Sequence, residues 1–344
     1  MKMFLGIAAG AAMLLSTGIA GAESVTLRYS SWLPPTHHVN LNVMNPWFEE
    51  IEKVTEGRVK VETLPKMVGT PQSQFDVVRD GLADISFIVP GYSPGRFVLA
   101  EMAELSFVGN DARLFAPIFN KIYREDLAGA NEFAEVELMT LVSNSPGQIG
   151  TTQKPVNSIA DMKGLKLRST GTYTTELLNI VGATPILKSS AEAYEMLTTG
   201  TIDGSMAQRE TVKNFNMMDL LKYYNVIPGG VFSSALAIIA NKDAWGRISE
   251  ADRAAIDAIS HEKLALALGT TYYNADADAE ATMRATPTMT INVVPDAFVA
   301  ELREAVKPLE AAWVERAKAK GIADPAAVLQ RFRDEVAAAE AAAK

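Results

Sequence analysis

The sequence predicts an α/β fold built as two lobes around a ligand cleft. Strand–helix–strand patterns recur along the chain, and Pro146 and Gly147 separate them into two sets. Units of this kind form parallel sheets. The segment Val231 to Ala240 is long, apolar and rich in β-forming residues, so it is suited to cross between the sets. We expect one lobe from residues 23–145 plus 233–275 and the other from residues 146–232 plus 276–344.

In the first set, apolar residues at Val25, Leu27 and Tyr29 alternate with polar ones and predict a strand. A loop with two prolines covers 30–38, and apolar residues on one side predict a helix over 41–56. The other expected elements are strand 59–63, helix 72–80, strand 84–89, helix 111–131 and strand 137–143.

The second set begins with strand 165–168, which places Arg168 at a strand end. We expect helix 173–181, strand 185–187, helix 191–199 and strand 201–203, the last followed by a tight Asp203-Gly204 turn. Alanine-rich composition predicts an unusually long helical stretch over 249–284 and helices over 295–320 and 324–342. Ligands of open α/β sheets bind at the carboxyl ends of strands, and closure of two lobes is the motion known for this architecture.

The N-terminus has the pattern of a secretory signal peptide. Lys2 precedes an apolar run that ends in Ala20-Gly21-Ala22, so we expect cleavage after Ala22 and export. The chain contains no cysteine, which excludes a lipid anchor through cysteine, a disulfide and a thiolate metal site. A freely diffusing exported protein without cysteine fits a bacterial periplasm.

Charge and motifs exclude several classes of function. The net charge is −9 and no basic cluster occurs, so nucleic-acid binding is not expected. The sequence contains neither G-x-x-x-x-G-K-[ST], the phosphate-binding loop of ATPases, nor G-x-G-x-x-G, the dinucleotide-binding motif. Both absences argue against an ATPase and against a dinucleotide cofactor. We therefore expect no cofactor.

Arg168 carries the strongest chemical signal. A guanidinium is always charged, and its planar fork matches a carboxylate bidentately. An arginine at the end of a buried strand therefore needs an anion, from the protein or from a ligand. The residue type alone leaves both sources open.

Five segments, in this order and spacing, resemble the substrate-binding proteins of TRAP transporters (the DctP type). They are 47–69, 77–87, 158–170 (SIADMKGLKLRST), 198–206 (TTGTIDGSM) and 235–256. The resemblance implies a periplasmic-binding-protein fold with a long helix that spans both lobes. It also implies a receptor that delivers an organic acid to a membrane transporter driven by an ion gradient, without chemistry on the ligand. In that family the arginine at Arg168 clamps the ligand carboxylate.

The resemblance also narrows the ligand. Sialic-acid members have a second arginine where this chain has Gln148, and an asparagine where it has Ala207 followed by Gln208. We therefore favour an aromatic, 2-oxo or hydroxy monocarboxylate, with a C4-dicarboxylate or other diacid as the alternative. Beside Arg168, we expect ligand contacts from residues at strand ends: Gln148, Gln208, Met206, Phe232, Tyr92 and His37.

Two other motifs have simpler interpretations. Gly91-Tyr92-Ser93-Pro94-Gly95 matches the nucleophile elbow, with His261 as a distant base, but Pro94 lacks the N–H that the oxyanion needs. His37 and His38 are adjacent, and we expect neighbouring side chains to point apart, so no metal site is predicted.

Three functions remain open at this stage. The favoured one is a transport receptor, expected to be a monomer that works with membrane-embedded TRAP subunits. The second is a chemosensory receptor of the same fold. An exported serine hydrolase that uses Ser93 and His261 ranks last.

Overall fold

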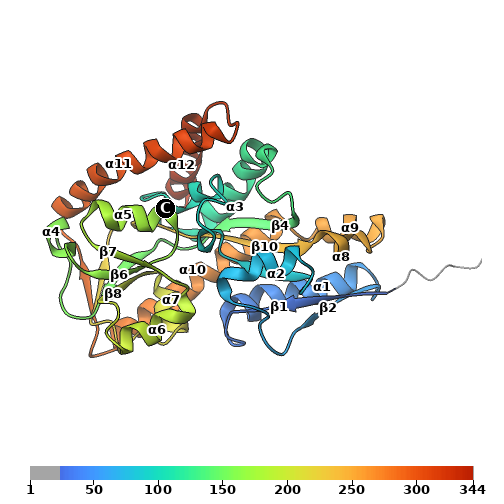
Figure 1. Ribbon diagram of the computed structural model, residues 1–344, viewed down its shortest axis with the longest axis horizontal. Coiled ribbons are helices and arrows are strands. Elements are labelled where there is room, and N and C mark those ends of the chain that lie inside the picture. Colours follow the sequence, from blue (N-terminus) through green and yellow to red (C-terminus); the bar gives the residue numbers. More distant parts are fainter. Residues whose placement is uncertain (1–23, 344) are drawn as a thin grey trace, which may run out of the picture.

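Two β-sheets flanked by helices form the two lobes of the molecule (Figure 1). The computed structural model describes residues 24–343, so the expected signal peptide and its cleavage site lie outside the described residues. We call the half with the five-stranded sheet the first lobe and the half with the six-stranded sheet the second lobe. The predicted two-lobed α/β fold is confirmed.

The first lobe is organised around the strand order β2-β1-β3-β10-β4. In β1, Leu27 and Tyr29 are buried on one face, whereas Thr26 and Arg28 are exposed, as the alternation predicts. The strand β1 pairs in parallel with β2 and β3, whereas β10 is antiparallel to β3 and β4. The elements are β1 (Val25–Ser30), α1 (Asn45–Val54), β2 (Val59–Thr63), α2 (Gln74–Arg79), β3 (Ile85–Ile88), α3 (Ala112–Ile122), β4 (Val136–Ser143), β10 (Ala235–Asn241), α8 (Lys242–Gly246) and α9 (Glu250–Asp257).

The second lobe has the strand order β11-β9-β5-β8-β6-β7. Its strands are only four residues long, and β5 runs antiparallel to both of its neighbours. The elements are β5 (Gln148–Thr151), α4 (Ile159–Met162), β6 (Lys166–Ser169), α5 (Thr172–Ile180), β7 (Thr184–Leu187), α6 (Ser190–Thr198), β8 (Gly204–Ala207), α7 (Arg209–Asn214), β9 (Tyr223–Val226) and β11 (Thr290–Val293).

The prediction of a strand at 201–203 was wrong. Residues 201–203 connect α6 to β8, and Gly204 begins the strand instead of turning after it. A Cβ on Gly204 would lie 2.1 Å from the carbonyl oxygen of Gly150 on β5. Glycine is needed at 204 because two strand backbones approach closely there.

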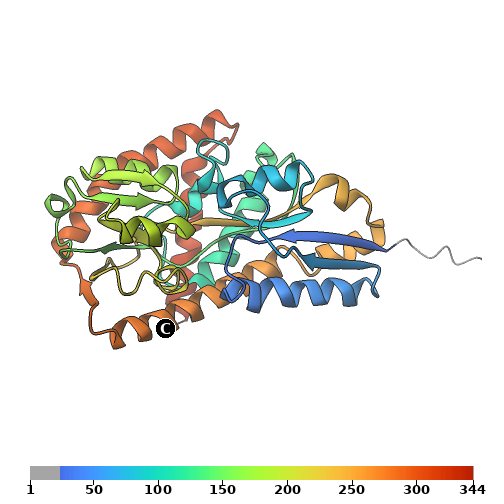
Figure 2. The same ribbon diagram turned by 60° about the horizontal axis from the view of Figure 1, so that its bottom comes forward.

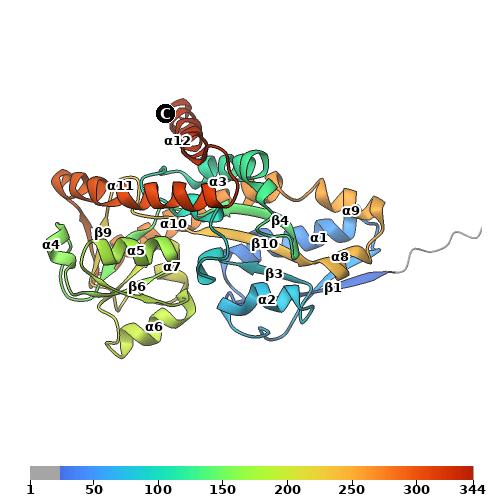
Figure 3. The ribbon, with the colours of Figure 1, turned by 45° about the horizontal axis from the view of Figure 1, so that its top comes forward.

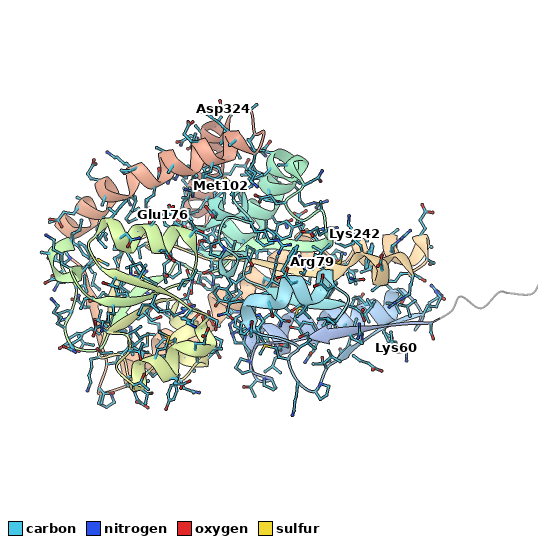
Figure 4. The ribbon with its side chains drawn as sticks, viewed as in Figure 1. Lys60, Arg79, Met102, Glu176, Lys242 and Asp324 are labelled. Carbon is cyan, nitrogen blue, oxygen red and sulfur yellow. The ribbon has the colours of Figure 1, made fainter. Side chains whose placement is uncertain are left out.

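Two helices of 24 residues connect the lobes, α10 (Glu262–Ala285) and α11 (Asp296–Ala319). The helix α10 packs against α3 and β4 of the first lobe and α7 of the second, and Figure 2 shows it running beneath both. Arg316 of α11 pairs with Glu101 of the first lobe (2.7 Å) and with Glu176 on α5 of the second (3.5 Å); Glu176 lies beside α11 in Figure 4. The expected spanning helix is therefore present, and α11 gives a second link.

Two expected helices are interrupted. The helix expected over 111–131 ends as α3 at Ile122, and turns of π and 3-10 type follow it. The stretch expected over 249–284 breaks between α9 and α10, where His261 has a φ of 48°. The N–H of His261 donates to Met139 and its carbonyl accepts from Thr140, so pairing with β4 stabilises the break.

The last helix, α12 (Pro325–Ala342), packs on α3 of the first lobe and projects from the body in Figure 3. The rings of Phe119 and Phe332 make this contact, with centroids 5.6 Å apart. The sheets follow the expected division of the chain, and the exact lobe boundaries stay a prediction. Within residues 24–343, no helix combines the length and the apolar character needed to cross a membrane.

Candidate ligand-binding site

A cavity lies between the two lobes, where the carboxyl ends of β1, β3, β4, β6 and β8 meet. Its volume is about 30 Å³, enough for water but too small for an organic acid. A ligand therefore enters only when the lobes move apart. Aromatic rings line the cavity from both lobes and from α10: Trp32, Phe87, Tyr92, Phe215 and Tyr272. Its polar lining consists of His37, Asn144, Arg168, Thr170, Ser190, Gln208, Glu210, Thr211 and Ser234.

Arg168, at the end of β6, is 1% exposed and makes four hydrogen bonds. Its Nε donates to the carbonyl of Lys188 (2.8 Å) and its Nη1 to the carbonyl of Met206 (3.1 Å). Its Nη2 donates to Tyr92 (3.3 Å) and Ser190 (3.1 Å). All four acceptors are uncharged, so none of these bonds neutralises the guanidinium. Burial lowers the pKa of Arg168, which is the cost of a desolvated cation.

The hydroxyl groups around Arg168 complete an anion site. Ser190 is the first residue of α6, and its N–H donates to the hydroxyl of Tyr92 (3.0 Å). Tyr92 comes from the first lobe, whereas Arg168 and Ser190 belong to the second. Donors from an arginine, a helix N-terminus and two hydroxyl groups together suit a carboxylate.

Glu210, in the first turn of α7, is a buried acidic residue that lines the same cavity as Arg168. Its Oε2 accepts from His38 (3.0 Å) and Asn214 (3.1 Å), and its Oε1 accepts from Thr211 (2.5 Å). Burial raises the pKa of Glu210, but the hydrogen bond and charge of His38 outweigh it and hold the pKa at about 2. The carboxylate is therefore ionised, and because His38 lies in the first lobe, the contact joins the lobes.

His37 and His38 do not point apart, which corrects the expectation from the sequence. His38 and Val39 adopt helical backbone, so the two rings stack with centroids 4.3 Å apart. The Nε2 of His37 lies 3.7 Å from Oε2 of Glu210, and potential ligand atoms of the three residues fall within 4.8 Å of one another. Nδ1 of His37 accepts from the N–H of Val39 (3.3 Å), which places the proton of the neutral ring on Nε2. A metal at Nε2 would move the ring proton to Nδ1 and break the hydrogen bond from Val39, so the residues fit a hydrogen-bond site better than a metal site.

The structure brings four of the seven expected contact residues to the cavity: Arg168, Tyr92, Gln208 and His37. Gln208 donates to Asn144 across the lobes (3.0 Å). Gln148 instead exchanges two hydrogen bonds with the backbone of Ile227 and lines a separate surface pocket. Met206 contributes its carbonyl to Arg168, and the ring of Phe232 covers Gly147. The contact roles of all seven stay predictions.

Ser93 and His261 are not brought together. Ser93 follows Tyr92 near the cavity, whereas His261 pairs with Met139 of β4, five residues before Asn144, which comes directly after that strand and lines the cavity. Five residues of strand span about 17 Å. The acidic partner of His261 is Asp257 at 3.6 Å, and neither residue lines the cavity.

Sequence reasoning missed several residues of the lining. Trp32 and Ser190 each follow a strand, so the rule that placed Tyr92 applies to them as well. Phe215 directly follows α7 and Tyr272 lies on α10, and the approach of both helices to the cavity depends on tertiary packing. The rings of Trp32 and Phe215 stack across the lobes at 6.2 Å and 16°.

A two-lobed α/β fold with a buried cation between its lobes, hydrogen-bonded only to uncharged groups, is suited to receive small organic anions. The family model for the bacterial extracellular solute-binding proteins of family 7 (DctP) matches residues 29–316, so the chain belongs to this family of periplasmic receptors. The resemblance to TRAP-transporter substrate-binding proteins is confirmed. Members bind small organic acids and work with membrane TRAP components.

Three known proteins illustrate the similarity. The TRAP periplasmic solute-binding protein of Bordetella bronchiseptica, with bound (R)- and (S)-mandelate, is 38% identical with a TM-score of 0.86, covering 91% of this chain and 98% of that one. The protein of Rhodoferax ferrireducens with benzoate is 26% identical with a TM-score of 0.85, covering 93% and 100%. The transporter protein TsaT of Comamonas testosteroni, described as an outer-membrane protein, is 29% identical over 317 residues, or 91% of this chain and 92% of that protein.

Proposed function

We propose that this protein captures an aromatic monocarboxylate in the periplasm and delivers it to a TRAP membrane transporter. The observation that carries the proposal is Arg168, a buried cation with only uncharged acceptors in a cavity walled by aromatic rings. The carboxylate of the ligand supplies the negative charge that pairs with Arg168. The aromatic ring of the ligand takes a place between Trp32 and Phe215, whose rings contact each other in the structure. The similarity to proteins with bound mandelate and benzoate supports the same class of ligand.

In this proposal the receptor performs no catalysis, acts as a monomer and carries no covalent membrane anchor. The separation of Ser93 from His261 supports the absence of a hydrolytic site. We also propose that the exported chain begins at Glu23, which the mass of the protein recovered from periplasm will test.

The experiment is calorimetric titration of the wild type and of Arg168→Met with benzoate, mandelate, pyruvate and succinate. We expect an aromatic acid to bind most tightly and Arg168→Met to weaken it by about 30-fold or more, because truncating one partner of a buried charge pair costs about 2–5 kcal/mol. Arg168→Lys, which keeps the charge but loses the fork, should be intermediate.

Arg209→Ala is the matched control. Arg209 lies on α7 in the same lobe, but it contacts Glu280 (3.2 Å) and does not line the cavity. It should bind ligand like the wild type. Tighter binding of succinate than of any aromatic acid would contradict the proposal, and so would unchanged affinity in a folded Arg168→Met protein.

A further inference from the structure

We infer that Glu210 and His37 form a second ligand subsite, which takes a hydroxyl group and rejects a second carboxylate. The inference rests on the proposed function and deepens it, because it selects hydroxylated aromatic monocarboxylates from the wider class. Both residues line the same cavity as Arg168, and they come from different lobes. The subsite therefore forms only when the lobes close.

Glu210 brings a fixed negative charge to the cavity. It is 3% exposed, and donors from His38, Asn214 and Thr211 stabilise the ionised carboxylate. Its own N–H donates to Asp276 of α10 (2.8 Å), and burial raises the pKa of Asp276 to about 7. Tyr272, on the same helix, is buried and its pKa is raised by burial, so it remains neutral.

His37 brings a hydrogen-bond donor to the same place. Burial lowers the pKa of His37 to about 4, more than the nearby Glu210 raises it, so the ring is neutral at pH 7. Because Nδ1 accepts from the Val39 N–H, the remaining proton is on Nε2, which faces Glu210 at 3.7 Å. That separation is too long for a hydrogen bond between the two residues.

A hydroxyl group fits between these atoms because it accepts and donates at once. An oxygen placed about 2.8–2.9 Å from each of them accepts from Nε2 of His37 and donates to Oε2 of Glu210. A hydrogen bond to a charged group is worth roughly 10- to 100-fold in affinity. A ligand without the hydroxyl leaves the Nε2–H without this acceptor.

A second carboxylate fits badly for reasons of charge. The guanidinium of Arg168 balances one ligand carboxylate, and the negative charge of Glu210 is already in the cavity. A diacid would bring two carboxylates together with little water between them, which disfavours binding strongly. Arg168 therefore selects for an acid, and Glu210 selects against a diacid.

Two series of aromatic acids test the subsite, each of which changes one substituent. The first is phenylacetate, mandelate and phenylmalonate, with hydrogen, hydroxyl or carboxylate on the same carbon. The second is benzoate, 3-hydroxybenzoate and isophthalate, with the same change on the ring. For the wild type, we expect mandelate or 3-hydroxybenzoate to bind at least about 10-fold tighter than the parent acid of its series. We expect both diacids, phenylmalonate and isophthalate, to bind at least about 100-fold more weakly than that hydroxylated acid.

Two substitutions separate the two roles. Glu210→Gln should reduce the penalty on the diacid by about 10-fold or more, because the charge is removed. His37→Phe should abolish the advantage of the hydroxyl but keep the penalty on the diacid, because Glu210 stays ionised. Glu192→Gln is the matched control: Glu192 is an ionised carboxylate that acts on Arg168 through its charge but does not line the cavity. It should leave both ratios unchanged.

The wild-type ratios decide the matter even if a variant fails to fold. Diacids that bind the wild type as tightly as the parent acids would overturn the subsite, as would a hydroxyl advantage that persists in both variants. Binding that requires an added divalent ion and is lost with a chelator would also overturn it, in favour of a metal at His37, His38 and Glu210. If parent acids bind through Arg168 but the ratios are flat, only the subsite fails. If no monocarboxylate binds, the proposed function fails and the subsite with it.

Discussion

Closure of the lobes over a ligand should depend on two glycines that touch across the cleft. Gly171 follows β6 in the second lobe, and Gly91 follows β3 in the first. A Cβ on Gly171 would lie 2.9 Å from Oε2 of Glu104 and 3.1 Å from the Cα of Gly91, both atoms of the first lobe. The φ of Gly171 is −177°, an extended conformation that alanine also adopts. Gly171→Ala should therefore strain the closed state and leave the open state unaffected.

The magnitude follows from the packing around Glu104. This side chain is 1% exposed, so it has little room to retreat, and the Cα of Gly91 belongs to the backbone. Overpacking of this kind costs about 1–3 kcal/mol, which corresponds to a roughly 5- to 150-fold rise in the dissociation constant.

Calorimetric titration with the tightest aromatic acid measures the effect, and thermal melting of the ligand-free protein tests whether the lobes remain intact. Gly246→Ala is the matched control, since a Cβ there meets nothing within 4 Å. It should bind like the wild type. Unchanged affinity for Gly171→Ala would refute the reasoning, and a strong fall in the melting temperature without ligand would show that the strain lies within one lobe.

Two further predictions concern the aromatic wall and a buried acid. Trp32→Leu removes the ring that stacks on Phe215 and should weaken aromatic acids by about 5-fold or more while sparing pyruvate, as parallel titrations will show. Burial raises the pKa of Glu132 to about 7, so the folded protein holds the proton of this carboxyl more tightly than the unfolded chain does. The resulting contribution to the free energy of unfolding is complete below about pH 4.5 and is lost as the pH rises through 7. Glu132→Gln should remove this loss, about 3 kcal/mol at most, in denaturant unfolding measured from pH 5 to 8; an identical pH profile for both proteins would contradict it.

Much of the fold could be predicted because local patterns encode it. The alternation at Leu27 and Tyr29 defines β1, and the alanine-rich tail defines α11 and α12. Strands of four residues, such as β9 and β11, are too short to carry a periodicity of their own. The start of β8 was misplaced for a related reason, because an Asp-Gly pair viewed alone indicates a turn. Only the neighbouring backbone of Gly150 in β5 shows why residue 204 must be a glycine.

The candidate site divides in a similar way. Arg168 lies near the carboxyl end of β6 and Tyr92 comes shortly after β3, so the rule that ligands bind at carboxyl ends of strands places both at the cavity. Glu210 and Tyr272 lie on helices, and their approach to Arg168 depends on how α7 packs against α10, which the local sequence does not specify. The sequence therefore could not show that a buried cation, Arg168, and a buried anion, Glu210, line the same cavity. In our proposal this pair of charges decides between monoacids and diacids.

The distribution of donors over the two lobes suggests the order in which the receptor assembles around its ligand. Carbonyls of the second lobe fix two nitrogens of Arg168, at Lys188 and Met206, so the fork is oriented before any ligand arrives and little entropy is lost on binding. The first lobe adds Tyr92 and His37 only on closure. An acid can therefore dock on the second lobe alone, but closure buries Arg168, and a bound carboxylate offsets the cost of burying that charge. We therefore expect closure of the lobes to be more favourable with an acid in the cleft than without one.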